Sequence, residues 1–296
     1  MSNILQNKDN RKACKERREN QNKNSANSAF SAVNFIQAGS GAPVIMIHGL
    51  AASLHDWDEL LPALVEAGYA GYALDLLGHG ESYKPSQLDH YTSDAVFEHM
   101  RGWIDTLKLE QPAVLIGHSL GGYLALEFAL RFPRQVRALV LVNPFYAQNQ
   151  LPAMLRFFLR RPLINTNLIE RTPYWLFRIL IDVSSLQFGN SKEQLHMLPE
   201  KVRIQTALDY KRAAPGIYNI PRTLRDLTPD LPRIKQPTLV IWGARDQTIS
   251  PKTFPFLVEK LPNARGEAMP VCGHVPHQCH ALDFDKKILD FLVSSQ

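Results

Sequence analysis

Residues 113–132 decide the fold, and they read AVLIGHSLGGYLALEFALRF. The apolar run 113–116 has the length of a strand buried on both faces, and residues 121–132 have the pattern of a helix. Between them, GHSLG at residues 117–121 matches the Gly-x-Ser-x-Gly pattern of a serine at a sharp turn from strand to helix. Such a turn closes only with small neighbours, and it brings the hydroxyl to the N–H groups that begin the helix. Because both flanking elements are present, we predict Ser119 to be a nucleophile rather than a serine that stands between two glycines by chance.

The same alternation extends along the chain in both directions. Short apolar runs typical of buried strands recur at residues 44–47, 72–74, 138–142 and 238–242. Helix-like segments lie between them, at residues 57–67, 92–107 and 251–260. Strand alternating with helix is typical of a parallel sheet joined by right-handed crossovers. We therefore predict the α/β class, with a mostly parallel sheet and helices on both of its faces.

The alternation stops between residues 143 and 235. This stretch is punctuated by prolines and reads as several short helices rich in large apolar side chains. A structureless loop of this length is uncommon in a compact domain, so we predict a helical cap inserted between two strands. Arg178 and Asp182 interrupt and end its most apolar run, which favours an amphipathic lid helix over a membrane segment. The predicted organisation is a tail at residues 1–28, an α/β core at 29–143 and 235–296, and a cap at 144–234.

The net charge of +5 belongs mostly to the first 28 residues, which carry seven basic and three acidic side chains. A basic tail says little about a partner of the folded body, and we predict no nucleic-acid partner. The tail is poor in large apolar residues, so it cannot bury enough surface to order itself. It lacks the apolar stretch of a secretory signal, and no uncharged run reaches the ~18 residues of a membrane span. We expect a cytoplasmic protein without an integral membrane segment; its oligomeric state is left open.

From about residue 30 to residue 292 the chain resembles the α/β-hydrolase family. Besides the serine motif, four stretches match in the family's order: His48-Gly49-Leu50, DLLGHGES at residues 75–82, WGARD at residues 242–246, and Gly273-His274. The resemblance implies Ser119 as nucleophile, Asp246 as acid and His274 as base, in the chain order that this fold uses. The chain departs from the family at Cys279, where a glutamate is common. It also has one convincing strand, at residues 32–37, where the family has two, which leaves open whether the sheet has its first strand.

Each of these residues has a chemical role. His274 would take the proton of Ser119 as it attacks a carbonyl, and then return it to the leaving group. Asp246 would hold the imidazole in one tautomer and stabilise the imidazolium. The backbone N–H groups of Leu50 and Leu120 are expected to form the oxyanion hole.

Other polar residues in these motifs have alternative assignments. We expect His48 and His79 to be structural residues that hold loops by hydrogen bonds. Asp75 is an alternative acid, but the resemblance places its loop in the scaffold. Some families carry the acid after the sixth strand, where this chain has Asn143, and this favours Asp246.

A cluster near the C-terminus has a competing interpretation as a zinc site, because sulfur and imidazole are zinc ligands. It comprises Cys272, His274, His277, Cys279 and His280. The spacing matches no common paired pattern, and a metal on His274 would occupy the base. We therefore predict neither a metal nor a cofactor, and three cysteines are too few for a disulfide framework.

The expected function is that of a serine hydrolase that forms an acyl-enzyme, with a small-molecule carboxylic ester as substrate. The apolar cap favours an apolar acyl or alcohol group, although the same side chains could simply form the cap's own core. The same three residues also serve thioester, amide and carbon–carbon bond hydrolases, lyases and cofactor-free oxidative enzymes, and the fold does not separate these. A non-enzymatic receptor or scaffold is the remaining alternative, and retention of all three residues counts against it.

Overall fold

The computed structural model describes residues 32–152, 156, 170–186 and 198–295. Residues Val33–Gln296 form one compact unit. The tail predicted at residues 1–28 lies outside the described residues. Within the described ranges, no helix combines the length and the apolar character that a bilayer crossing requires.

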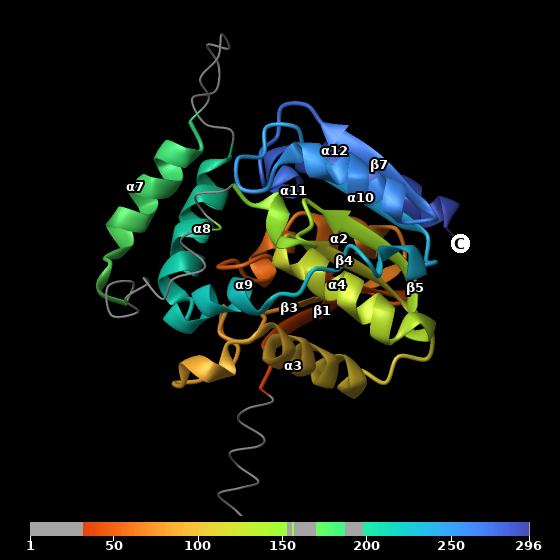
Figure 1. The fold of residues 1–296 in the computed structure, drawn as a ribbon, viewed down its shortest axis with the longest axis horizontal. Coiled ribbons are helices and arrows are strands. Elements are labelled where there is room, and N and C mark those ends of the chain that lie inside the picture. Colours follow the sequence, from red (N-terminus) through yellow and green to blue (C-terminus); the bar gives the residue numbers. More distant parts are fainter. Residues whose placement is uncertain (1–31, 153–155, 157–169, 187–197, 296) are drawn as a thin grey trace, which may run out of the picture. The chain divides into compact units, whose positions relative to one another are not determined.

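A seven-stranded sheet lies at the centre of this unit, in the order β1-β3-β2-β4-β5-β6-β7 (Figure 1). The strands are β1 Phe35–Ala38, β2 Ala42–Ile47, β3 Tyr69–Leu74, β4 Ala113–His118, β5 Val136–Val142, β6 Thr238–Gly243 and β7 Ala264–Met269. β1 is antiparallel to β3, and every other neighbouring pair is parallel. The predicted α/β class with a mostly parallel sheet is confirmed. Among the described residues, a single strand precedes β2.

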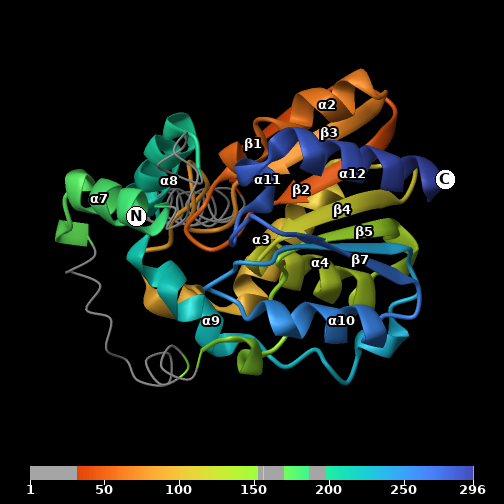
Figure 2. The ribbon, with the colours of Figure 1, turned by 90° about the horizontal axis from the view of Figure 1, so that it is seen from above.

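Alternate residues of the central strands enter two separate cores. On β2, Ile45 and Ile47 belong to one core, whereas Val44 and Met46 belong to the other. The first core is completed by α3 Ser93–Thr106, α4 Leu120–Arg131 and α10 Phe254–Lys260, and the second by α2 Leu60–Glu66 and α12 Ala281–Ser294. Figure 2 shows these two layers of helices on opposite sides of the sheet. Because the central strands are buried on both faces, their sequences are continuous apolar runs.

The helices follow local sequence signals. Thr92 precedes α3 in an extended conformation, and its hydroxyl accepts a hydrogen bond from the Ala95 N–H at 3.1 Å, which caps the helix. The helix predicted at residues 57–67 is a 3₁₀ turn, η1 Leu54–Trp57, followed by α2. The remaining short elements outside the β5–β6 connection are η2 Leu88–His90, η3 Pro133–Gln135, η7 Pro251–Thr253 and α11 Pro276–Cys279.

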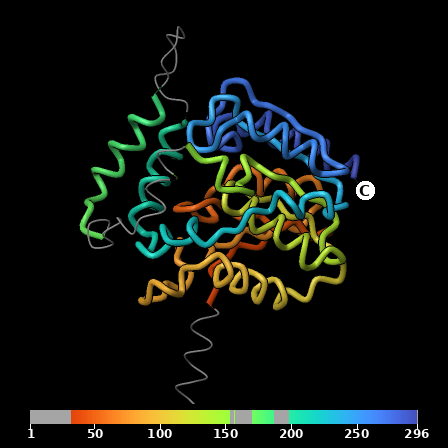
Figure 3. Tube along the Cα trace, viewed as in Figure 1, coloured from red at the N-terminus to blue at the C-terminus, as the bar shows by residue number. Residues whose placement is uncertain are grey.

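The described residues between β5 and β6 are mostly helical. They form η4 Gln148–Gln150, α7 Tyr174–Ser184, α8 Glu200–Arg212, η5 Pro215–Asn219, α9 Ile220–Thr223 and η6 Leu231–Arg233. α7 and α8 lie side by side (Figure 3), and the ring of Phe177 on α7 lies 6.0 Å from that of Tyr210 on α8. The division into a core and a separate cap stays a prediction.

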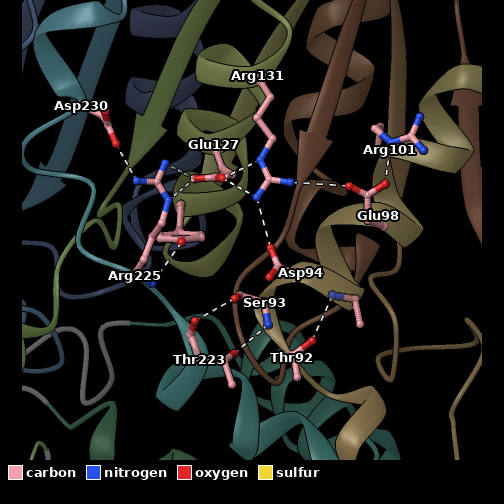
Figure 4. Close-up of polar contacts among 12 residues, drawn as sticks. Thr92, Ser93, Asp94, Glu98, Arg101, Glu127, Arg131, Thr223, Arg225 and Asp230 are labelled. Carbon is pink, nitrogen blue, oxygen red and sulfur yellow. Dashed lines mark hydrogen bonds and ion pairs between the residues drawn. The ribbon is translucent and has the colours of Figure 1, made fainter.

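Polar contacts anchor the segment around and after α9 on the layer formed by α3 and α4 (Figure 4). Ser93 donates two hydrogen bonds to Thr223, from its N–H to the hydroxyl at 2.7 Å and from its hydroxyl to the carbonyl at 2.9 Å. The buried carboxylate of Glu127 on α4 accepts hydrogen bonds from Arg131 at 2.6 Å and from Arg225 at 2.9 Å. Since Arg225 lies beyond α9, these bonds tie the β5–β6 connection to the central fold.

Candidate active site

Ser119 lies at the turn between β4 and α4 in a conformation that few residues adopt, with φ 50° and ψ −109°. Two glycines make this turn possible. A Cβ atom on Gly117 would lie 2.3 Å from the Gly121 carbonyl oxygen, and one on Gly121 would lie 2.1 Å from the Ile47 carbonyl oxygen. The Ser119 N–H donates to the Val142 carbonyl at 2.9 Å, which ties the turn to β5. The spacing of the Gly-x-Ser-x-Gly motif is therefore a steric requirement of this turn.

His274 and Asp246 come together where the parallel strands have their carboxyl ends, as Ser119 does. Asp246 follows β6, His274 follows β7, and the imidazole Nδ1 lies 2.8 Å from the Asp246 Oδ2 atom. The side chain of Asp246 is fully buried, whereas that of His274 is 21% exposed. One ring nitrogen is thus engaged with a buried carboxylate, and the imidazole keeps a path to solvent.

Hydrogen bonds fix both carboxylate oxygens of Asp246. Oδ1 accepts from the N–H groups of Thr248 at 2.7 Å and Ile249 at 3.0 Å, and Oδ2 accepts from the Asn143 amide at 2.6 Å. Burial alone would raise the pKa of Asp246, but the charge interaction with His274 and these hydrogen bonds lower it below its usual range. Asp246 is therefore a carboxylate at neutral pH and can stabilise a charged imidazole.

The loop that carries His274 packs against the end of β6 and against the serine turn. A Cβ atom on Gly243 would lie 1.9 Å from the Gly273 carbonyl oxygen, so only glycine allows this approach. The His118 Nε2 atom lies 2.9 Å from the His274 carbonyl oxygen, and the two rings are 4.9 Å apart. Because His118 immediately precedes Ser119, these contacts bring the His274 loop to the serine.

The predicted oxyanion residues flank the serine. A Cβ atom on Gly49 would lie 3.3 Å from the Ser119 Cβ, which places the His-Gly loop and its next residue, Leu50, beside the turn. Leu120 is the first residue of α4. The N–H groups at the start of a helix suit a developing negative charge.

His48, His79 and Asp75 are placed in the surrounding loops. The His48 Nε2 atom accepts from the Leu76 N–H at 3.0 Å, and the His79 Nδ1 atom lies 2.9 Å from the Leu77 carbonyl oxygen. The Asp75 carboxylate accepts from the Leu54 and Glu81 N–H groups, each at 2.8 Å. All three side chains hold loops together by hydrogen bonds, as expected for structural residues.

The five residues considered as a zinc cluster separate into three groups. His274 contacts Asp246, whereas His277 faces Asp56 and His118. The ligand atoms of Cys272, Cys279 and His280 lie within 4.8 Å of one another. A hydrogen bond with Cys279, together with burial, raises the pKa of the Cys272 thiol.

Sequence reasoning missed two residues that the structure brings to this edge. Asn143 was considered only as a position without an acid, yet its amide contacts Asp246. Its place directly after the run 138–142 was an available signal, since the carboxyl ends of parallel strands share one edge. Asp56 gave no signal, because it lies in η1 and reaches His118 only through the tertiary fold.

A cavity of about 310 Å³ lies elsewhere in the molecule. It is lined by residues at the end of α3 and at the start of β4, including Ile104, Leu109 and Ala113. These residues lie at the amino end of β4, whereas Ser119 follows its carboxyl end. The cavity is therefore not part of the candidate active site.

Comparison with known proteins places the chain in a family. The model of the alpha/beta hydrolase fold matches residues 42–181. A 2-hydroxy-6-oxononadienedioate/2-hydroxy-6-oxononatrienedioate hydrolase of Paraburkholderia xenovorans (strain LB400) is 30% identical over 273 residues, which cover 88% of this chain and 90% of that protein. The chain therefore belongs to the α/β-hydrolase family.

Further similarities agree with this assignment. The bifunctional epoxide hydrolase 2 of Sus scrofa is 33% identical over 142 residues, 48% of this chain, and the chain spans only 25% of that protein. A thermophilic esterase of Thermogutta terrifontis has the same fold, with a TM-score of 0.74 at 21% identity over 89% of this chain and 93% of the esterase. The hydrolase names of the sequence relatives support a hydrolase on this fold.

Proposed function

We propose that the protein is a serine hydrolase that works through an acyl-enzyme. The observation that carries the proposal is the 2.8 Å contact between His274 and the buried Asp246, held against the turn that presents Ser119. His274 accepts the Ser119 proton as the hydroxyl oxygen bonds to a carbonyl carbon. The oxyanion forms beside the N–H groups of Leu50 and Leu120 and collapses as the leaving group departs with the proton from His274. Water, deprotonated by His274, then releases the acyl group.

A carboxylic ester with an apolar group is the substrate class that we favour. In the described part of the β5–β6 connection, Phe177 on α7 packs on Tyr210 on α8, and Tyr210 packs against the apolar core. Burial, together with the charge of Asp56, raises the pKa of Tyr210, so its hydroxyl is neutral. A site bounded by such side chains gains affinity by removing apolar surface from water.

Carbon–carbon bond hydrolysis is the second candidate. It is favoured by the similarity to the Paraburkholderia xenovorans hydrolase over 90% of that protein's length. The two candidates differ in the leaving atom, which is oxygen in an ester and carbon in a dienedioate of the kind named for that relative. In carbon–carbon bond hydrolysis the leaving group must be protonated on carbon. Product analysis therefore distinguishes the two reactions.

The test begins with covalent labelling by a fluorophosphonate, which requires an activated serine. Ser119→Ala is expected to abolish labelling and to reduce ester hydrolysis on the order of 10⁴-fold or more. Ser294→Ala, at the C-terminal end of α12, is the matched control and should keep both. Labelling that persists in Ser119→Ala would mean that the nucleophile is another residue.

Substrate class is then measured on p-nitrophenyl esters of increasing acyl length and on a 2-hydroxy-6-oxo-dienoate. We expect kcat/KM to rise with acyl length because more apolar surface is buried. A flat series together with turnover of the dienoate would replace the ester proposal by the second candidate.

A further inference from the structure

Three ionisable side chains from separate parts of the chain meet behind the serine turn. Asp56 comes from η1, His118 from the last position of β4 and His277 from α11. Their side chains are 7%, 5% and 1% exposed. The group lies next to the candidate active site. His118 contacts the His274 carbonyl oxygen, whereas no hydrogen bond among the described residues joins Asp56 or His277 to Ser119, His274 or Asp246.

The spacing of the facing atoms fits metal ligands, and it is wider than that of strong hydrogen bonds. Asp56 Oδ2 lies 3.4 Å from His118 Nδ1 and 3.8 Å from His277 Nε2. In the described structure none of these three atoms makes a hydrogen bond. Ligands at about 2.0–2.2 Å from a tetrahedral ion lie about 3.3–3.6 Å from one another, so these separations are close to the edges of such a tetrahedron.

The proton on His118 can be assigned from its other nitrogen. Nε2 lies 2.9 Å from the His274 carbonyl oxygen, which can only accept, so Nε2 carries the hydrogen. In the neutral ring, Nδ1 then presents a lone pair to a carboxylate oxygen. Two lone pairs repel, so a positive species between them, a proton or a metal ion, stabilises the pair. A proton on Nδ1 joins His118 to Asp56 alone, whereas a metal ion also engages His277 Nε2, which converges on the same oxygen.

The surroundings supply what an ion needs. Gln278 Nε2 donates to the other oxygen of Asp56 at 2.9 Å, which leaves Oδ2 turned towards the imidazoles. A cavity of about 50 Å³ is lined by Asp56 and Gln278, together with Asp58, Glu59, His55 and Lys201. Lys201 forms an ion pair with Glu59 at 3.6 Å, and His55 contacts Asp58 at 3.1 Å. The carboxylates that line the cavity outnumber its one ammonium group, which favours a cation there.

We propose that Asp56, His118 and His277 bind one divalent ion of the zinc class, with water from the cavity in the remaining position. The arrangement at His118 is typical of such a ligand, because a metal-bound histidine usually donates its second N–H to a carbonyl or carboxylate. Here the acceptor is the backbone of His274. The ion therefore positions the loop of the candidate base and takes no part in the reaction at Ser119.

The experiment uses the full chain, purified without a histidine tag. Zinc content is measured by mass spectrometry before and after treatment with a chelator, and Zn²⁺ or Co²⁺ is then added back. We expect about one equivalent of metal, a Tm that falls by several degrees on chelation and returns with Zn²⁺, and the visible absorption of tetrahedral Co²⁺. Less than a tenth of an equivalent, with no response to either ion, overturns the proposal.

Variants distinguish this site from the neighbouring sulfur cluster. Asp56→Asn and His277→Gln are expected to lose the metal, whereas the control Cys279→Ser should retain it. Retention in Asp56→Asn with loss in Cys279→Ser would assign the ion to Cys272, Cys279 and His280 instead. Should the first two variants fail to fold, the wild-type cobalt spectrum decides alone, because a thiolate ligand adds an intense ultraviolet band and the proposed ligands do not.

Discussion

Asp246 illustrates how much of the candidate site depends on the placement of single atoms. Its Oδ1 atom is held by two backbone N–H groups, and its Oδ2 atom is shared between Asn143 and His274. A carboxylate held on both oxygens cannot rotate away from the imidazole. The direction of the Nδ1 hydrogen bond, and with it the tautomer of His274, is therefore fixed before a substrate arrives.

Asn143→Ala tests this arrangement. It removes a hydrogen bond to a carboxylate, a type of bond that contributes about 1.5–3 kcal/mol. If that bond orients the base, kcat should fall about 10- to 100-fold with KM nearly unchanged. Steady-state kinetics on an ester provides the measurement, and Asn263→Ala, which removes a surface amide bonded to Lys235, is the control. Unaltered kcat would show that the two N–H groups hold Asp246 without help.

Asp209 predicts a pH dependence of stability. Burial raises its pKa to about 7, with a further contribution from the charge of Asp56, while hydrogen bonds from Gln205 and Ser53 oppose the rise. In the unfolded chain an aspartate titrates near pH ~3.9, so the folded state binds more protons between these values. Stability therefore falls as the pH rises through this window and stays low above it.

The variant Asp209→Asn should escape this loss. Its advantage over the wild type in free energy of unfolding is expected to be larger at pH 8 than at pH 5, by about 2.5 kcal/mol, since one pKa unit corresponds to ~1.4 kcal/mol. Urea unfolding at the two pH values measures it. An equal difference at both values would show that the carboxyl is charged in the fold throughout.

At the scale of elements, what the sequence could predict depended on burial. The strands around β4 are apolar on both faces, and their runs were recognised directly. β7 was missed because it is an edge strand of the sheet and has exposed residues. Its sequence, ARGEAM, has neither a continuous apolar run nor a regular alternation of apolar and polar residues. Ser119, Asp246 and His274 could be predicted because each lies in a recognisable sequence motif. The contact of Asn143 with Asp246 was signalled only by its place after the run 138–142. The contact of Asp56 could not be found, because it joins residues distant in the chain through packing alone.

Replacement by alanine is predicted to have opposite effects at two helical glycines, because their surroundings differ. An alanine at position 121 would place its Cβ 2.1 Å from the Ile47 carbonyl oxygen, so β2 or α4 must shift. Gly121→Ala should therefore lower the Tm by several degrees and abolish activity. Gly102 on α3 has no atom within 4 Å of the corresponding position, and Gly102→Ala should stabilise the protein by about 0.5–1 kcal/mol. Thermal unfolding of both variants is the test, and similar shifts would contradict it.

For the whole molecule, Glu127 is one of the residues that join the β5–β6 connection to the central layers. Its side chain is 4% exposed, and its partners Arg131 and Arg225 are partly exposed. Glu127→Ala leaves two guanidinium groups without their buried partner, which water compensates in part. We expect a loss of about 2 kcal/mol in the free energy of unfolding. Arg233→Ala, at a largely exposed ion pair, is the control and should change it by less than about 0.5 kcal/mol.

The backbone of Ser119 has a consequence for how this protein changes over generations. A non-glycine residue at φ 50° and ψ −109° has a strained backbone conformation, which costs on the order of 1–3 kcal/mol of folding free energy. That is a large share of a net stability of about 5–15 kcal/mol. Glycine would remove this strain and the hydroxyl together. In a laboratory population selected for abundance alone, chains with glycine at position 119 should accumulate early, so only continued selection on turnover keeps the serine.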